Sequence, residues 1–160
     1  MPIYMNYDSL ALKGKVTEEG HVGWIELNSL QWGVGRGISS PTGASADRES
    51  SAPSVSEITV TKAQDASSVK VLDECLQGEG KTVLIDFAKT DKGKLEVFLT
   101  YTLTNCMISG YSISSGGDRP QESLSLNFTK VEFKNTPTKS AGETASPETV
   151  TYDLALAKVV

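Results

Sequence analysis

The sequence predicts a mainly β protein, a single antiparallel β-barrel or sandwich of about eight strands with one flanking α-helix. Short runs in which apolar and polar residues alternate, separated by turn residues, recur along the 160 residues. One stretch departs from this alternation and has a helical period instead. With 38% hydrophobic and 22% charged residues, the composition is that of a globular chain that folds without disulfide or metal. We therefore predict one domain over residues 1–160.

The predicted strands share this period of two, and they cover residues 3–8, 22–35, 55–63, 82–89, 95–105, 107–114, 123–133 and 150–157. The clearest is 95–105, in which every second residue from Leu95 to Leu103 is apolar and most of the residues between them are polar. Such a strand has one face in a core and the other in water. Asp91-Lys92-Gly93 predicts a short hairpin before it.

Residues 67–77 predict the helix, because apolar residues recur there at helical spacing. Asp65 or Ser67 can cap its start, and Gly78 suits a left-handed position at its end. We expect the apolar stripe to pack against one side or mouth of the barrel. The residues of this stripe are Val69, Leu72 and Leu76, widened by Val71 and Cys75.

Two segments, 36–54 and 135–149, are rich in small and polar residues and are predicted to be long connections. In the first, Ile38 is the only large apolar residue, so this segment cannot build a core of its own and is expected to be a mobile extended loop. Long loops inside compact domains are uncommon unless they serve a function.

Charge and hydropathy exclude several classes of partner. The net charge is −5, and no cluster of Lys and Arg exists that could neutralise phosphates, which argues against nucleic acid. No run approaches the roughly 20 apolar residues of a membrane span, and the first residues do not form a signal peptide. Cys75 and Cys106 are far apart in sequence and are interpreted as reduced core residues.

Motifs for catalysis or cofactor binding are weak, so we predict no enzyme, no metal and no cofactor. Gly80-Lys81-Thr82 looks like the end of a phosphate-binding loop, but position 75 is Cys75 where that motif needs glycine, and a helix precedes the motif instead of following it. His21 is the only histidine, and we expect it to orient a turn before the strand over 22–35.

The most distinctive string, SGGDRPQESLSLNFTKVEF at 115–133, combines a glycine-permitted reversal with an alternating strand. It closely resembles the signature of the Hcp family of bacterial type VI secretion systems. Other pieces occur in that family's order: Lys13-Gly14-Lys15 before His21, Ile25-Glu26-Leu27 before Trp32-Gly33-Val34, Ile58–Lys62 before Asp65, then Thr136-Pro137-Thr138-Lys139 and Tyr152-Asp153.

This resemblance implies a small β-barrel that forms hexameric rings, which stack into a hollow tube. The tube lies inside a contractile sheath on a baseplate, is capped by a spike protein, and carries secreted effectors in its lumen. It also implies synthesis in the bacterial cytoplasm and export without a signal peptide. Strands with apolar residues on both faces, such as Val83–Ala88, favour assembly independently. The alternative is a small-ligand-binding β-barrel.

Three sets of residues are candidates for the surfaces of such a ring. Polar positions of the strand over 22–35 are lumen candidates: Glu26, Asn28 and Gln31. Charged residues of the loop over 36–54 are candidates for contacts between stacked rings: Arg36, Asp47, Arg48 and Glu49. Lateral-interface candidates come from a parity break, because Leu124, Leu126 and Phe128 are even-numbered whereas Val131 and Phe133 are odd-numbered. Either a bulge near Thr129-Lys130 returns all five to the core, or Val131 and Phe133 lie on a surface, which we favour.

Overall fold

The computed structural model describes residues 1–40, 43, 48, 50–137 and 146–160. Antiparallel strands and one helix make up its regular structure, which confirms the predicted mainly β class. The elements in chain order are β1 Ile3–Tyr7, β2 Ile25–Leu27, β3 Ser29–Gln31, β4 Val34–Gly35, β5 Ser54–Val55, β6 Ile58–Ala63, α1 Ser68–Gln77, β7 Lys81–Asp91, β8 Lys94–Ser114, β9 Gln121–Asn127, β10 Lys130–Asn135, β11 Glu148–Asp153 and β12 Lys158–Val159.

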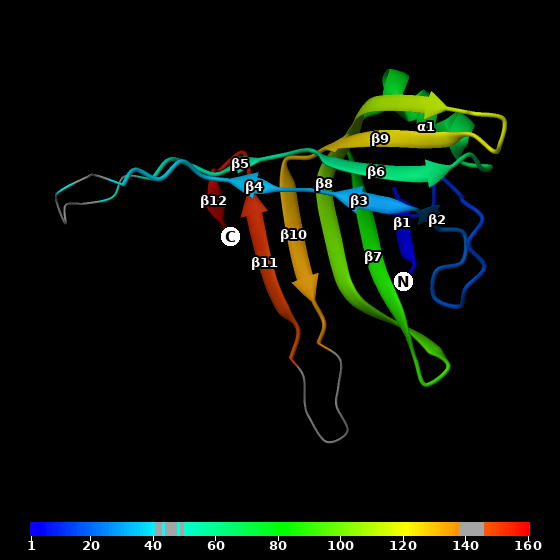
Figure 1. Cartoon of the computed structure of the whole chain (residues 1–160), viewed down its shortest axis with the longest axis horizontal. Coiled ribbons are helices and arrows are strands. Elements are labelled where there is room, and N and C mark those ends of the chain that lie inside the picture. The colour runs from blue at the N-terminus through cyan, green and yellow to red at the C-terminus, as the bar shows by residue number, and fades with distance from the viewer. Residues whose placement is uncertain (41–42, 44–47, 49, 138–145) are drawn as a thin grey trace.

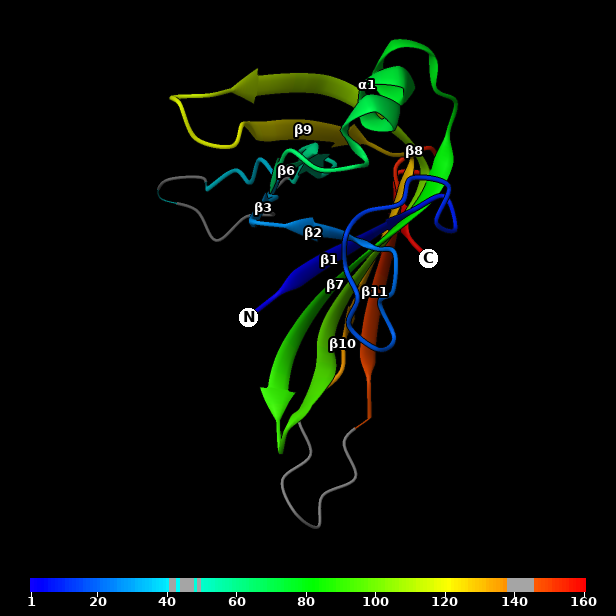
Figure 2. The same ribbon diagram turned by 90° about the vertical axis from the view of Figure 1, so that its right-hand side faces the viewer.

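Two sheets share the long strand β8. The larger, which we call sheet A, has the order β12-β11-β10-β8-β7-β1-β2, and the smaller, sheet B, has the order β3-β6-β9-β8. Figure 2 shows the sheets at a steep angle to each other, with β8 running from one into the other. The first part of β8 pairs with β7 and β10, and the part from Met107 onward pairs with β9.

The strands predicted at 95–105 and 107–114 are thus one strand of 21 residues. Asn105 has a positive φ of 54°, which few residues other than glycine adopt. It lies at the point where β8 leaves sheet A for sheet B. A side chain at Gly80 would clash with Asn105, so the glycine lets the chain pass close to this bend.

Two predicted strands are divided because the chain changes sheets within them. The stretch over 22–35 becomes β2 in sheet A, β3 in sheet B and β4 in a separate ribbon. The stretch over 123–133 ends its sheet B part at Asn127 and begins its sheet A part at Lys130. Each sheet turns one face to the interior, so this change of sheet reverses which parity is inside.

The parity break is resolved by that change of sheet. Leu124, Leu126 and Phe128, which precede the change of sheet in the chain, are buried. Val131, which follows it, is also buried, at 3% exposed. The preferred expectation that Val131 lies on a surface is therefore wrong. Phe133 is half-buried, and its ring meets Tyr101 edge-on with the centroids 5.2 Å apart.

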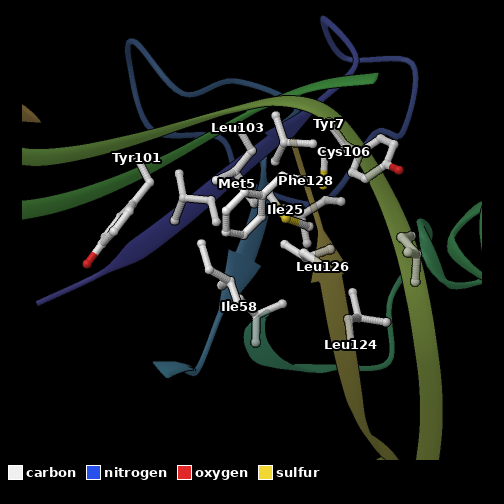
Figure 3. Packing of buried hydrophobic residues seen from close by; sticks show 14 of the residues in the cluster. Met5, Tyr7, Ile25, Ile58, Tyr101, Leu103, Cys106, Leu124, Leu126 and Phe128 are labelled. Carbon is white, nitrogen blue, oxygen red and sulfur yellow. The ribbon is translucent and has the colours of Figure 1, made fainter. Parts of the chain in front are cut away.

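The core lies between the two sheets and draws side chains from both. Figure 3 shows Met5 and Ile25 of sheet A converging with Ile58, Leu124 and Leu126 of sheet B. All five are fully buried. Each such side chain contributes roughly 1.5–3 kcal/mol on burial. The interior is filled by these side chains, which removes the support for a ligand-binding barrel.

Helix α1 is present as predicted, but its predicted apolar stripe is wrong at three positions. Val71 is fully buried and Cys75 is half-buried, whereas Val69, Leu72 and Leu76 are exposed. The helical spacing of the apolar residues correctly predicted a helix. These residues, however, spread over a wide part of the helix circumference, and only the part with Val71 and Cys75 packs against the rest of the fold. Gly78 is extended, with φ −69°, so the expected left-handed C-terminal position is also wrong.

The described ends of the segment over 36–54, which was predicted to be a mobile extended loop, are paired with each other. Beyond the β4–β5 ribbon, the amide of Ser51 donates to the carbonyl of Gly37 at 2.9 Å, and Ile38 bridges to Ser50. Figure 1 shows this ribbon reaching away from the sheets. Arg48 Nε donates to the carbonyl of Ser39 at 3.3 Å. The predicted contact residues Asp47 and Glu49 lie outside the described residues.

Candidate interaction surfaces

The outward face of sheet B is an uncharged polar surface. Strand register aligns its side chains into two rows that cross all four strands. The first row is Ser29, Thr61, Ser123 and Ser112, and the second is Gln31, Thr59, Ser125 and Gly110. Residues between them, such as Val60 and Leu124, are buried. None of these eight residues is charged, in a chain that is 22% charged.

Neutral residues also occupy the ends of this face. Ala63, Gln121 and Ser114 form one flank, and Asn127 with Met107 forms the other. Cross-strand bonds hold several polar groups in place: Ser29 Oγ and Thr61 Oγ1 are 2.5 Å apart, and Asn28 Nδ2 donates to Gln121 Oε1 at 2.8 Å. The face is thus a fixed array of hydroxyl and amide groups.

A single carboxylate, Glu57, borders the neutral face just before β6. Asn127 Nδ2 donates to its Oε1 at 3.0 Å, and Ser109 Oγ donates to its Oε2 at 2.7 Å. Both hydrogen bonds lower the pKa of Glu57, and the one from Asn127 has the larger effect. Together they outweigh burial, which acts to raise this pKa. Beside it lies a cavity of about 340 Å³, which we call the Glu57 hollow; it is lined by Gln31, Trp32, Gly33, Ser56, Glu57 and Thr59.

The three lumen candidates do not share one surface. Gln31 and Asn28 lie at the edge of sheet B, Gln31 within the second row and Asn28 against Gln121. Glu26 lies on β2 in sheet A, opposite Tyr4, and its carboxylate is 3.4 Å from Lys15 Nζ. The chain passes between the sheets from β2 to β3, so sequence neighbours are placed on different surfaces.

Beneath the neutral face, β6 and β9 carry a buried ion pair that was not predicted. Lys62 Nζ is 2.5 Å from Glu122 Oε1 and 3.0 Å from Asp65 Oδ1, and Lys62 and Glu122 are almost fully buried. Ser68 Oγ donates to Glu122 Oε1 at 2.6 Å, and Tyr111 also donates to Glu122. Burial acts to raise the pKa of Glu122, but the hydrogen bonds from Lys62, Ser68 and Tyr111 hold it below its usual value.

A signal for this ion pair was present in the alternation. Lys62 has the parity of the buried Ile58 and Val60, and Glu122 has the parity of the buried Leu124 and Leu126. Charged residues at inward positions of two neighbouring strands predict a buried pair, since an unpaired charge there is costly. This pair joins sheet B to the first turn of α1 through Ser68.

His21 is buried between two carboxylates and holds the loop that precedes β2. Its Nδ1 lies 2.5 Å from Glu18 Oε2, and its Nε2 lies 2.9 Å from Asp86 Oδ2 on β7. The rings of Tyr4 and Trp24 pack on it at centroid distances of 4.9 and 4.6 Å. This arrangement fits the predicted role of orienting the turn.

Two apolar patches lie at opposite ends of the molecule. One is the exposed side of α1, with Val69, Leu72 and Leu76. The other is the far end of sheet A, where exposed apolar residues follow one another in β11, β12 and their connection: Val150, Leu156, Val159 and Val160. Figure 1 places α1 and β12 on opposite sides of the fold. No helix in the described ranges has the length and apolar composition needed to cross a membrane.

A β fold with a filled core, a neutral polar face and separated apolar patches defines a protein that works by contacting other proteins. A family model described as "Type VI secretion system effector, Hcp" matches residues 4–134, and the chain belongs to this Hcp family. It is accordingly a structural, secreted component of a type VI secretion system and not an enzyme.

Solved structures agree with this assignment. A structure described as that of a type six secretion system protein is 26% identical, with a TM-score of 0.88 and 99% of each chain covered. A type VI secretion system effector from Yersinia pestis is 22% identical, with a TM-score of 0.73 over 94% of this chain and 98% of that one. Hcp1 from Salmonella typhimurium is 18% identical, also with a TM-score of 0.73, over 99% and 98%. Among curated protein sequences, none matches the chain.

Proposed function

We propose that the chain is the subunit of a hexameric ring, and that rings stack into a hollow tube that carries effectors inside a contractile sheath. The observation that carries this proposal is the family match together with four distinct surfaces. A ring needs two different lateral patches, a contact along its axis and an inner wall, and the fold offers a candidate for each. A spike protein at the tip and a baseplate at the base complete the set of proposed partners.

The two apolar patches are the proposed lateral contacts. A ring is built from heterologous interfaces, in which one surface of a subunit meets a different surface of the next. The exposed side of α1 and the far end of sheet A are such a pair, since they lie at opposite ends of the molecule. Phe133 belongs to the second patch, because it pairs with the exposed Val150 on the same face of sheet A. Val131 is buried within the subunit and is withdrawn as a contact.

The segment over 36–54, which continues from the β4–β5 ribbon, is the proposed contact between stacked rings. It extends beyond the sheets and carries the exposed Arg36 and Arg48, whose guanidinium groups suit carboxylates of a neighbouring ring. The proposal keeps Asp47 and Glu49 as further contacts on sequence grounds alone.

Sheet B is the proposed inner wall. Its outward face carries solvent-accessible hydroxyl and amide groups and no charged side chain in its two rows. A polypeptide that passes along this face would therefore form no strong ion pairs with it. Asn28 and Gln31 are kept as lumen residues, and Glu26 is withdrawn because it faces out from sheet A.

Light scattering coupled to size exclusion tests the oligomeric state. We expect a mass of about six times 17.1 kDa, decreasing on dilution if the interfaces are weak. A mass of one chain at every concentration contradicts the ring.

A further inference from the structure

The loop over 8–24, which connects β1 to β2 and which we call the strap, is attached to the outward face of sheet A through one buried histidine. Figure 2 shows the strap, drawn in blue, beside β1 and β7. We propose that the strap is a pH-dependent latch, which the doubly protonated ring of His21 holds closed and which loss of a ring proton at higher pH releases. The inference concerns the single chain and does not depend on the ring.

Both ring nitrogens of His21 face carboxylate oxygens. Nδ1 lies 2.5 Å from Glu18 Oε2 within the strap, and Nε2 lies 2.9 Å from Asp86 Oδ2 on β7. An ionised carboxylate only accepts hydrogen bonds, and a neutral imidazole has one donor nitrogen and one acceptor nitrogen. Two such bonds therefore require a proton on each nitrogen. When one proton is lost, a lone pair of the ring faces a carboxylate oxygen and one of the two bonds is broken.

The sheet side of the latch is fixed by a hydrogen bond from a third strand. Thr100 Oγ1 on β8 donates to Asp86 Oδ1 at 2.8 Å, which leaves Oδ2 directed at His21. Lys15 of the strap is engaged elsewhere, with its Nζ 3.4 Å from Glu26 Oε2. The bond between His21 and Asp86 therefore links the strap directly to the middle of sheet A.

Two aromatic rings cover His21, which is 6% exposed. Tyr4 on β1 and Trp24 at the end of the strap pack on it from different sides. Burial, and then the charges of Glu18 and Glu26, raise the pKa of Tyr4 from its ordinary value of 10.0. Tyr4 is thus neutral in the range where a histidine titrates, ordinarily about pH 6.5. Release of the strap would expose this side of β1 and β7 to solvent.

The start of the strap is strained. Asp8, Ser9 and Leu10 have φ values of 53°, 50° and 69°, a left-handed conformation that is unfavourable for residues with a side chain and rare in succession. The amide of Leu10 donates to Asn6 Oδ1 at 2.8 Å, which helps to hold this turn. Because the closed strap carries this strain, its backbone favours opening, and the bonds of His21 oppose that tendency.

Nuclear magnetic resonance tests the latch directly. His21 is the only histidine, so labelling histidine with nitrogen-15 gives one pair of ring-nitrogen signals. We expect both nitrogens to carry a proton at pH 7. As the pH rises and one proton is lost, the amides of His21 and Gly23, which donate to the carbonyls of Glu18 and Val16, should lose their protection from hydrogen exchange over the same pH range. Amides of β1 and β7 should keep theirs.

Variants with one charge fewer separate the latch from a merely structural loop. Asp86→Asn should open the strap at a pH about one unit lower than in the native chain. Glu18→Gln, which leaves sheet A unchanged, should do the same and covers the case in which Asp86→Asn does not fold. Glu132→Gln, on β10 of sheet A, is the matched control and should leave the opening pH unchanged.

A second pair of variants tests the strain. Ser9→Gly should raise the opening pH by about half a unit, because glycine adopts a positive φ without a steric penalty. Ser9→Ala, which keeps the side-chain carbon, should not raise it, and equal behaviour of the two variants contradicts the strained closed state. A single ring proton on His21 at pH 7, or strap amides whose protection is unchanged when the ring loses a proton, overturns the proposal. The same opening pH in Glu18→Gln and Glu132→Gln also overturns it.

Discussion

Lys62 and Glu122 lie at inward positions of their strands, where the other inward residues are aliphatic. Together they connect β6, β9 and the start of α1. The Lys62 ammonium group balances the carboxylates of Glu122 and Asp65, and Ser68 ties the same group to the start of α1. A buried pair of this kind adds little net stability, but removal of one partner leaves an uncompensated charge in the interior.

Lys62→Met should therefore lower the free energy of unfolding by roughly 3–5 kcal/mol at pH 7. Two carboxylates would then be buried without their cation. Urea unfolding followed by circular dichroism measures the loss. Lys15→Met is the control, because Lys15 pairs with Glu26 on the surface and both side chains are 47% exposed; its effect should stay below about 1 kcal/mol. A loss as small as that of the control contradicts the assigned role.

The pH dependence of unfolding should report Glu122. Its pKa is lowered in the folded chain from the ordinary value of 4.5, so the folded state binds its proton less readily than the unfolded state does. The contribution to stability is complete above pH 4.5 and is lost as the pH falls through the lower folded value. Unfolding curves between pH 6 and 3 should show this loss in the native chain. In Glu122→Gln, the slope over the lower part of that range should be smaller than in the native chain, with the contribution of Glu57, whose pKa is also lowered, still present. An unchanged slope would assign the effect to other carboxylates.

At the scale of elements, the sequence predicted where strands and the helix occur better than it predicted which surface each residue faces. Alternation located the strands, but it could not show that 22–35 and 123–133 each cross from one sheet to the other. That crossing depends on pairings such as Val60 with Leu124, which are distant in sequence. For the same reason Glu26 and Gln31 were assigned to one surface although they lie on two.

Helix α1 shows the same limit and offers a test. Its apolar residues span more of the helix than β8 covers, so Val71 is buried while Leu76 is 76% exposed. Leu76→Asp should leave the subunit folded and dissociate the ring, because a charge would enter a proposed apolar contact. Val71→Ala should do the reverse, lowering subunit stability by roughly 2 kcal/mol. Light scattering and circular dichroism together distinguish the two; an intact ring in Leu76→Asp would remove α1 from the lateral interface.

Phe133→Asp tests the opposite lateral patch. The side chain is half-buried beside Tyr101, and its strand partner Val150 is exposed. We expect native-like circular dichroism and a hydrodynamic size near 17 kDa. Ser29→Asp, on the neutral face of sheet B, is a matched control that should keep the ring. A misfolded Phe133→Asp chain would show that Phe133 belongs to the subunit core and not to the interface.

At the scale of the whole molecule, the fold separates its surfaces. One sheet face is neutral, the apolar patches lie at opposite ends, and the β4–β5 ribbon reaches past the sheets. The charges that give the chain its net −5 are therefore located elsewhere than on the outward rows of sheet B. This separation is what a ring with an inner wall, two lateral contacts and an axial contact requires. The sequence singled out the segment over 36–54, Asn28 and Gln31 of the inner wall and Phe133 of one lateral patch, but not the exposed side of α1.

The segment over 36–54, between β4 and β5, should govern stacking and not ring formation. Replacement of residues 38–53 by a short glycine-serine linker removes most of the axial contact but leaves α1 and the end of sheet A unchanged. Single rings should persist in negative-stain images, whereas tubes and secretion should be impaired. Loss of the rings themselves would move the ribbon to the lateral interface.

The most direct measurement of the central claim is an electron cryomicroscopy reconstruction of the purified chain at high concentration. We predict a six-fold ring with a central channel in which the outward face of sheet B, with Ser123 and Ser125 in its rows, lines the wall. A compact single chain, or a ring in which sheet B faces outward and sheet A lines the channel, would contradict the account.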